Sequence, residues 1–147
     1  MQSLKDRHVV VTGGTGALGS AVVKAFIEAG AICHIPAIES TPPTGHLPDS
    51  KQIEVVPSID LSNEASVDSF YARLPPLHAV VNIAGGFAYA PIADSPLKVL
   101  QQQLSMNVVS CALSCAPPSP TSARAGKAAI SSTSPPALPS IRARAPT

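Results

Sequence analysis

A glycine-rich segment near the start of the chain has the spacing of a phosphate-binding turn. Gly14, Gly16 and Gly19 form the pattern G-x-G-x-x-G directly after the β-branched run Val9–Val11. Glycines permit a tight turn and a close approach to a pyrophosphate, which the free N–H groups of a following helix attract. A strand before the pattern and a helix after it predict a dinucleotide site; the alternative is a structural turn without a ligand. The residues expected to hold the dinucleotide here are Gly13, Gly14, Thr15, Gly16, Leu18 and Gly19.

The sequence leaves open which dinucleotide would bind. In such sites an acidic residue about 20 positions after the glycines bonds the ribose 2′-OH, or an Arg nearby accommodates a 2′-phosphate. Here Pro36 and Ala37 end the second apolar run, and Glu39 comes slightly late, in a proline-rich loop where a solvated charge is the simpler interpretation. No Arg is placed to hold a 2′-phosphate. NAD and NADP therefore both stay open as cofactors.

Apolar runs and helical stripes alternate around these residues. Strands are expected at 9–11, 31–35, 53–56 and 79–83, because each is a short apolar run bounded by turn residues. A helix after the glycines is expected to bury one stripe: Leu18, Ala21, Val22, Ala25, Phe26 and Ala29. A last helix carries another apolar stripe: Leu97, Leu100, Leu104, Val108, Cys111 and Cys115. The alternation predicts an α/β fold, a partial Rossmann domain whose doubly wound parallel sheet has strand order 3-2-1-4.

Four segments resemble, in the same order, the short-chain dehydrogenase/reductase (SDR) family. They are the glycine segment Thr12–Gly19, the pair Asp60-Leu61, the run Asn82-Ile83-Ala84-Gly85, and Asn107 in the last helix. The resemblance implies NAD(P)-dependent hydride transfer between an alcohol and a carbonyl. It also implies cofactor contacts from Asp60, Leu61, Asn82, Ala84 and Gly85, and a catalytic role for Asn107, which would hold a water of the proton relay. The Thr-Gly-x-x-Gly-x-x-Gly spacing also occurs in extended members such as sugar-nucleotide epimerases, whereas the Asn82 motif favours the ordinary branch.

Each polar residue in this set also has a structural interpretation. Asp60 could be a turn residue whose side chain bonds backbone amides. Asn82 could join neighbouring strands. Asn107 lies in an apolar helical stripe, where an amide is costly unless it is hydrogen-bonded. The pattern alone supports structural and functional use of Asn107 equally, and the resemblance favours function.

The catalytic pair that the resemblance implies is missing from this chain. The family uses a Tyr as proton donor and a Lys four residues later, because a cation must lower a Tyr pKa that is otherwise about 10. At that spacing Tyr71 is followed by Pro75, and Tyr89 by Ala93. The activity of the chain is therefore doubtful. A non-catalytic dinucleotide-binding or regulatory protein, or an inactive fragment, is the alternative.

Composition divides the chain near Cys115. Of the 32 residues from 116 to 147, 24 are Ala, Pro, Ser or Thr, and the charged ones are all basic. Such a segment buries too little apolar surface to offset the entropy of ordering it. We expect residues 1–115 to form an incomplete NAD(P)-binding domain and 116–147 a disordered tail, so that the sheet ends at its fourth strand. A frameshifted, truncated family member and a natural extension are both open origins. Within the tail, Ile130–Ser132 partly resembles the strand carrying the family's Ser, which makes Ser132 a catalytic candidate.

The overall composition excludes several classes of function. The chain has 147 residues, 45% of them hydrophobic, and a formal net charge of +1, which suits one globular domain without general attraction to nucleic acid or membranes. Its three Cys form no Cys-x-x-Cys pair and its four His have no ligand spacing, so we assign no metal and expect a reducing compartment. The first residues include no apolar leader, which predicts a cytoplasmic protein. The substrate cannot be inferred, and an oligomer stays open because the family's dimer helix pair is incomplete.

Overall fold

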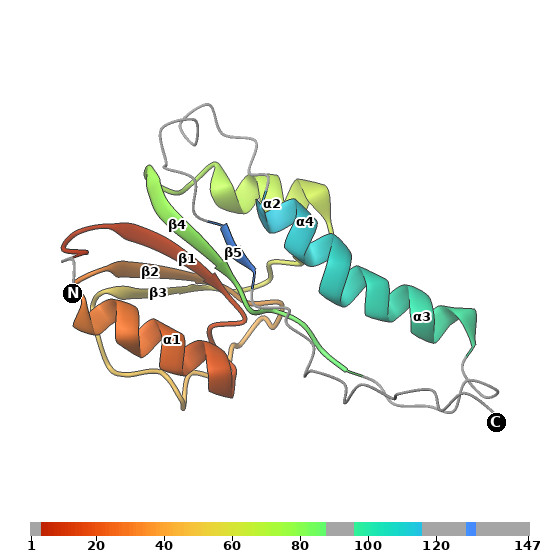
Figure 1. Cartoon of the computed structure of the whole chain (residues 1–147), viewed down its shortest axis with the longest axis horizontal. Coiled ribbons are helices and arrows are strands. Elements are labelled where there is room, and N and C mark those ends of the chain that lie inside the picture. The colour runs from red at the N-terminus through yellow and green to blue at the C-terminus, as the bar shows by residue number, and fades with distance from the viewer. Residues whose placement is uncertain (1–3, 88–95, 116–128, 132–147) are drawn as a thin grey trace, which may run out of the picture.

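The computed structural model of the chain describes residues 4–87, 96–115 and 129–131. One sheet of parallel strands runs in the order β3-β2-β1-β4-β5 (Figure 1). The strands are β1 (His8–Thr12), β2 (Ile32–Pro36), β3 (Ile53–Val56), β4 (Leu77–Asn82) and β5 (Ala129–Ser131). The helices are α1 (Ala17–Glu28), α2 (Glu64–Tyr71), α3 (Leu97–Leu104), the π-helical stretch η2 (Ser105–Val109) and α4 (Ser110–Cys115). Helix α1 covers one face of the sheet and α2 the other, which is the doubly wound arrangement that the sequence predicts.

The predicted strand order 3-2-1-4 is confirmed, but the sheet has one strand more than expected. Strand β5 pairs in parallel with β4, with Val80 opposite Ala129 and Asn82 opposite Ser131. The expectation that the sheet ends at β4 is therefore wrong. The partial resemblance of Ile130–Ser132 to a family strand was the one signal for β5 in the sequence, because the strand has only three residues and lies among Ala, Pro and Ser. Apart from β5, the expected disorder of 116–147 falls outside the described residues.

Strand β1 lies in the middle of the sheet and is buried on both faces. Val9 and Val11 pack with Val23 of α1, whereas Val10 packs with Phe70 of α2 on the opposite face. The three valines of β1 are 0% exposed. A continuous β-branched run suits such a strand because helices cover both of its faces. Burial of each Val side chain contributes roughly 1.5–3 kcal/mol, so β1 firmly positions the turn that follows it.

Helix α1 packs on the sheet through a face that overlaps the predicted one only in part: Val22 and Phe26 of the predicted stripe are partly buried against the core. Its buried residues are Gly19, Ser20 and Val23, whereas Leu18 is 63% exposed. The buried face is thus shifted toward Gly19 and Val23, while it keeps Val22 and Phe26 of the expected stripe. The cause is a close approach: Gly19 lies against the backbone of the preceding turn. Gly19 therefore lies against the turn, and Leu18 is left at the surface.

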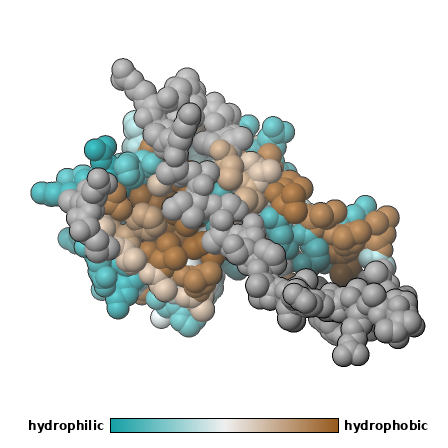
Figure 2. All heavy atoms as spheres, viewed as in Figure 1, coloured by the Kyte–Doolittle hydropathy of each residue, from teal (hydrophilic) through white to brown (hydrophobic). Residues whose placement is uncertain are grey.

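The last helix is one rod made of α3, η2 and α4 (Figure 1). Its predicted apolar stripe exists but is not buried: Leu97, Leu100, Leu104 and Val108 are between 48% and 67% exposed. Figure 2 shows apolar residues along α3 on the visible surface. None of the eight residues of α3, all of which the structure describes, is buried, because this part of the rod extends beyond the sheet. The rod packs on the body through α4, whose Ser110 and Ser114 are its buried residues.

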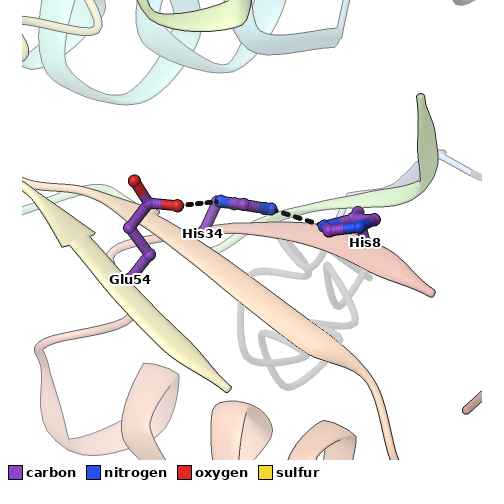
Figure 3. Close-up of polar contacts among 3 residues, drawn as sticks. All are labelled: His8, His34 and Glu54. Atoms are coloured by element: carbon purple, nitrogen blue, oxygen red, sulfur yellow. Dashed lines mark hydrogen bonds and ion pairs between the residues drawn. The ribbon is translucent and has the colours of Figure 1, made fainter. Parts of the chain in front are cut away.

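A chain of hydrogen bonds crosses three strands on the α2 face of the sheet (Figure 3). His34 Nδ1 lies 2.8 Å from Glu54 Oε2, and His34 Nε2 lies 2.9 Å from His8 Nδ1. Because the carboxylate accepts from His34 Nδ1–H, the other nitrogen of His34 accepts a hydrogen bond from His8. Burial lowers the pKa of His34 and outweighs the hydrogen bond and charge of Glu54, which raise it. The fold therefore holds a neutral His34 inside the sheet.

Candidate functional site

The glycine turn joins the carboxyl end of β1 to α1 and is packed against backbone. Gly13 has a φ of +68°, which favours glycine, and its carbonyl accepts a hydrogen bond from Gly16 N–H at 3.1 Å. A methyl group on Gly13 would lie 2.7 Å from the backbone nitrogen of Ala84, and one on Gly19 would overlap the Gly13 carbonyl oxygen. Gly14 has the same constraint against a side chain of β2. Packing therefore requires Gly13, Gly14 and Gly19 in this turn even before a ligand is considered.

The amino end of α1 is open to an anion. The N-cap residue is Gly16, which has no capping side chain, and the first turn of α1, described in full, contains no acidic residue. A methyl group on Gly16 would meet only the Gly13 carbonyl oxygen, at 3.4 Å. Thr15 is half-buried and Leu18 is exposed beside it. Among the described residues no side chain comes within 4 Å of that methyl position, which leaves room for a pyrophosphate beside the free N–H groups and positive dipole end of α1.

Thr12 joins the carboxyl ends of β1 and β4. Its hydroxyl oxygen accepts hydrogen bonds from the N–H groups of Ile83 at 3.1 Å and Ala84 at 3.2 Å. The same hydroxyl donates to Asn82 Oδ1 at 3.4 Å, and Thr12 is 1% exposed. These bonds hold the Ala84 backbone beside the glycine turn. Sequence reasoning missed this role; the only signal was a hydroxyl residue at the end of a buried strand.

Asn82 is buried, and both ends of its amide have partners. Oδ1 accepts the hydrogen bond from Thr12, and Nδ2 donates to Sγ of Cys115 at 3.0 Å. Asn82 thus connects β1, β4 and the end of α4. This geometry supports its structural interpretation, and contact with a cofactor stays a prediction.

Asn107 anchors the loop that follows β4. Its Oδ1 accepts from Gly86 N–H at 3.0 Å, while its Nδ2 donates to the carbonyl oxygens of Gly86 at 2.9 Å and Gln103 at 3.0 Å. A methyl group on Gly85 would lie 2.6 Å from Asn107 Oδ1, so this close approach requires glycine. Asn107 lies in η2, and π-helical turns inside helices often occur at functional sites. Its amide is satisfied by the loop, and its use in a proton relay stays a prediction.

Asp60 and Leu61 follow β3 and have partners of their own. Asp60 Oδ1 accepts hydrogen bonds from Ser62 N–H at 2.8 Å and from Ser62 Oγ at 2.7 Å. Leu61 packs against the apolar cluster under α2. The turn interpretation of Asp60 thus has direct support. Among the described residues, no hydrogen bond joins this pair to the glycine turn or to the β4 loop. Contact of the pair with adenine stays a prediction.

Tyr71 is not placed to replace the missing proton donor. It is 3% exposed, and its hydroxyl donates to the carbonyl oxygen of Ser114 at 2.9 Å. Burial raises the pKa of Tyr71, so the phenol stays protonated and bound inside the protein. Tyr89 and the candidate Ser132 lie outside the described residues.

Two further properties concern the described residues alone. They contain no group of three or more His, Cys, Asp or Glu that could hold a metal ion. Their helices are too short or too polar to cross a membrane.

The comparisons with known proteins define the class of this chain. The model of the NAD dependent epimerase/dehydratase family matches residues 9–134, and the chain therefore belongs to that family. The family uses NAD as its cofactor, and its description names epimerases, in which the glycine spacing of this chain also occurs. A search of curated protein sequences gave no match.

Similar solved structures are dehydrogenases. A short-chain dehydrogenase from Leptospira borgpetersenii has 20% identity and a TM-score of 0.66, over 74% of this chain and 43% of that one. A short-chain dehydrogenase/reductase from Brucella melitensis has 20% identity and a TM-score of 0.68, over 78% and 52%. Serine dehydrogenase from Escherichia coli has 18% identity and a TM-score of 0.64, over 73% and 52%. These likenesses confirm the Rossmann-type fold, and the chain spans about half the length of the structures it matches.

Proposed function

We propose that this chain binds NAD or NADP at the carboxyl edge of its sheet, with the pyrophosphate at the amino end of α1. The observation that carries the proposal is the open, uncapped start of α1 beside the backbone of Ala84. The residues that would hold the dinucleotide are Gly13, Gly14, Thr15, Gly16, Leu18, Gly19, Asp60, Leu61, Asn82, Ala84 and Gly85. A bound dinucleotide supplies a hydride acceptor or donor at its nicotinamide.

Both forms of the cofactor are included for a structural reason. The end of β2 leads into Ala37, which is 5% exposed, and Ile38, which is 66% exposed, so no charge there selects for or against a 2′-phosphate. Among similar structures, the Leptospira dehydrogenase is described with bound NAD⁺ and a serine dehydrogenase with NADP⁺. By family, the reaction would be oxidation or reduction of an alcohol or carbonyl compound of unknown identity. We place the protein in the cytoplasm, an assignment that its three free thiols support.

The sharpest test replaces Gly16 with Ala. The N-cap backbone of Gly16, with φ −78° and ψ 171°, accepts an L residue, and the added methyl keeps 3.4 Å from its nearest neighbour. We expect the fold to survive with a loss of about 1 kcal/mol or less. The methyl would occupy the approach of the pyrophosphate, so affinity for NADH and NADPH should fall by about tenfold or more, equivalent to ~1.4 kcal/mol. Fluorescence titration with both dinucleotides measures this.

A matched control is available in the same chain. A methyl group on Gly45 would meet nothing within 4 Å, so Gly45→Ala should bind dinucleotide as the parent does. Unchanged affinity in Gly16→Ala would contradict the proposed site. Gly13→Val is a poorer probe, because its positive φ and its contact with Ala84 strain the fold as well as the site.

A further inference from the structure

Two cysteine thiols lie one helical turn apart at the end of α4. Cys111 is half-buried and Cys115 is exposed, and neither is part of a disulfide. The two thiols lie close enough for Cys111 to affect the ionisation of Cys115. Residues four apart on a helix share one face, so both sulfurs are presented on the same side of the rod. This pair takes no part in the glycine turn described above.

A polar group from the sheet supports one of the two sulfurs. Asn82 Nδ2 donates to Cys115 Sγ at 3.0 Å, and Asn82 is itself 4% exposed and fixed by Thr12 at its other end. A buried, oriented N–H donor favours negative charge on the sulfur that it contacts. The two thiols and the Asn82 amide that donates to one of them therefore form one structured group rather than two unrelated surface cysteines.

Helix geometry decides which chemistry the pair can perform. Side chains four residues apart on a helix have Cβ atoms about 5–6 Å apart. A disulfide requires a Cβ–Cβ distance of about 3.5–4.5 Å. Direct S–S bonding would therefore distort the end of α4, whereas one large atom bonded to both sulfurs spans the gap without moving the backbone.

We propose that Cys111 and Cys115, with Asn82 behind Cys115, form a chelating dithiol site for a soft thiophilic centre of the trivalent arsenical class. Thiolates are the soft ligands of proteins and bind such centres in preference to oxygen or nitrogen ligands. With an organic arsenic(III) oxide, two As–S bonds form and both bonds from arsenic to oxygen break. The oxygen leaves as water with the two thiol protons. Arsenic and sulfur keep their oxidation states, so no oxidant or reductant is needed.

Binding of the protonated thiols releases no proton to the solvent, because both thiol protons leave in the water that forms. Burial and the neighbouring Cys111 raise the pKa of Cys115, while the hydrogen bond from Asn82 lowers it. The Cys115 thiol therefore starts protonated near neutral pH, and affinity should stay constant until the pH approaches the raised pKa of Cys115, above which it should fall. The third cysteine, Cys33, is 0% exposed and burial raises its pKa to about 11, so it serves as an unreactive internal reference.

The test is titration of the full chain with phenylarsine oxide. We expect one equivalent to bind, two of the three thiols to disappear from a thiol assay, and dithiothreitol to reverse the reaction at concentrations where a monothiol does not. Trypsin separates the sites, because the cleavage points Lys24, Lys51, Lys98 and Arg124 place Cys33 in one peptide and the pair in another. The arsenic should be found in the peptide 99–124.

Two variants and one oxidation assay keep the proposal open to contradiction. Cys111→Ser and Cys115→Ser each leave one sulfur, and loss of chelation should weaken binding by about 100-fold or more. Both changes are at accessible positions, and circular dichroism checks that the fold remains. Retained affinity in either variant, or arsenic on the Cys33 peptide, would overturn the site. Rapid formation of a 111–115 disulfide under a mild oxidant such as diamide would overturn the argument from helix spacing.

Discussion

At the scale of single residues, one hydroxyl group holds two strand ends together. The Thr12 hydroxyl accepts hydrogen bonds from two backbone N–H groups in the loop after β4. In Thr12→Val both N–H groups would lose this acceptor. Because unpaired buried donors cost about 1–3 kcal/mol, we expect Thr12→Val to lower the free energy of unfolding by that amount. Thr12→Ser keeps the hydroxyl and is the matched control. Urea unfolding curves compare the three proteins. Equal stability of Thr12→Val and the parent would contradict the proposed role of the Thr12 hydroxyl.

A second residue-scale prediction concerns pH. Burial lowers the pKa of His34 in the folded state below the value of about 6.5 that an exposed His has. The neutral form is thus favoured by folding, so this stability is complete above about pH 6.5 and is lost as pH falls through the lowered pKa. Chemical unfolding at intervals between pH 8 and about pH 5.5 should show a plateau and then a decline.

The variant His34→Gln separates this residue from other titrating groups. Gln keeps a donor for Glu54 but has no charge to gain, so the decline below about pH 6.5 should become shallower. His46 is exposed in the loop after β2, and His46→Gln should decline as the parent does. An unchanged decline in His34→Gln would assign the pH dependence to another group.

The residues of the site differ in how far the sequence could predict them. Gly13 and Gly19 were predictable because the reasons for glycine are local: a positive φ and contact within one turn. The partners of Asn82 and Thr12 were not, since Cys115 is 33 positions from Asn82 and Ala84 is 72 from Thr12. Hydrogen bonds of that separation depend on the completed fold, and residue type alone does not reveal them.

At the scale of elements, a single phenol ties α2 to α4. Tyr71 donates from inside the protein to the carbonyl oxygen of Ser114. In Tyr71→Phe the ring packing against Phe70 remains while the hydrogen bond is lost. We expect a loss of about 0.5–1.5 kcal/mol in the free energy of unfolding, the usual net value of one hydrogen bond. Thermal unfolding of Tyr71→Leu, compared with Tyr71→Phe, separates loss of the hydrogen bond from loss of the aromatic ring. An unchanged unfolding midpoint in Tyr71→Phe would show that this hydrogen bond does not stabilise the contact between α2 and α4.

The elements themselves were predicted better than their orientations. The β-branched run of β1 and the prolines around the helices identified the order of strands and helices, because these signals act on the backbone locally. The buried face of α1 was predicted only in part, since the close approach at Gly19 as well as hydrophobicity sets how that helix lies. The stripe on α3 was identified from its helical spacing, yet it is not buried because that helix extends beyond the sheet. Periodicity identifies a face, but the tertiary arrangement decides what covers it.

At the scale of the whole molecule, the division of the chain near Cys115 stays a proposal. Residues 4–87 and 96–115 contain both apolar clusters, and the pyrophosphate end of the site lies within them. Strand β5, however, comes from beyond this boundary and pairs with β4. A boundary inferred from composition can therefore fall between two strands of the same sheet. Strand pairing uses backbone hydrogen bonds, which are available to almost any residue.

The last prediction concerns the enzymatic activity of residues 1–147. The chain keeps an open dinucleotide turn, but no Tyr in its sequence has a Lys four residues later, and the buried Tyr71 is committed to Ser114. Loss of a general acid alone usually costs about 10²- to 10⁴-fold in rate. We therefore expect dinucleotide binding without measurable dehydrogenase turnover. The measurement follows NAD(P)H absorbance with purified residues 1–147 over a panel of alcohols and ketones. Robust turnover that disappears in Tyr89→Phe but persists in Tyr71→Phe would contradict this expectation and identify a different proton donor.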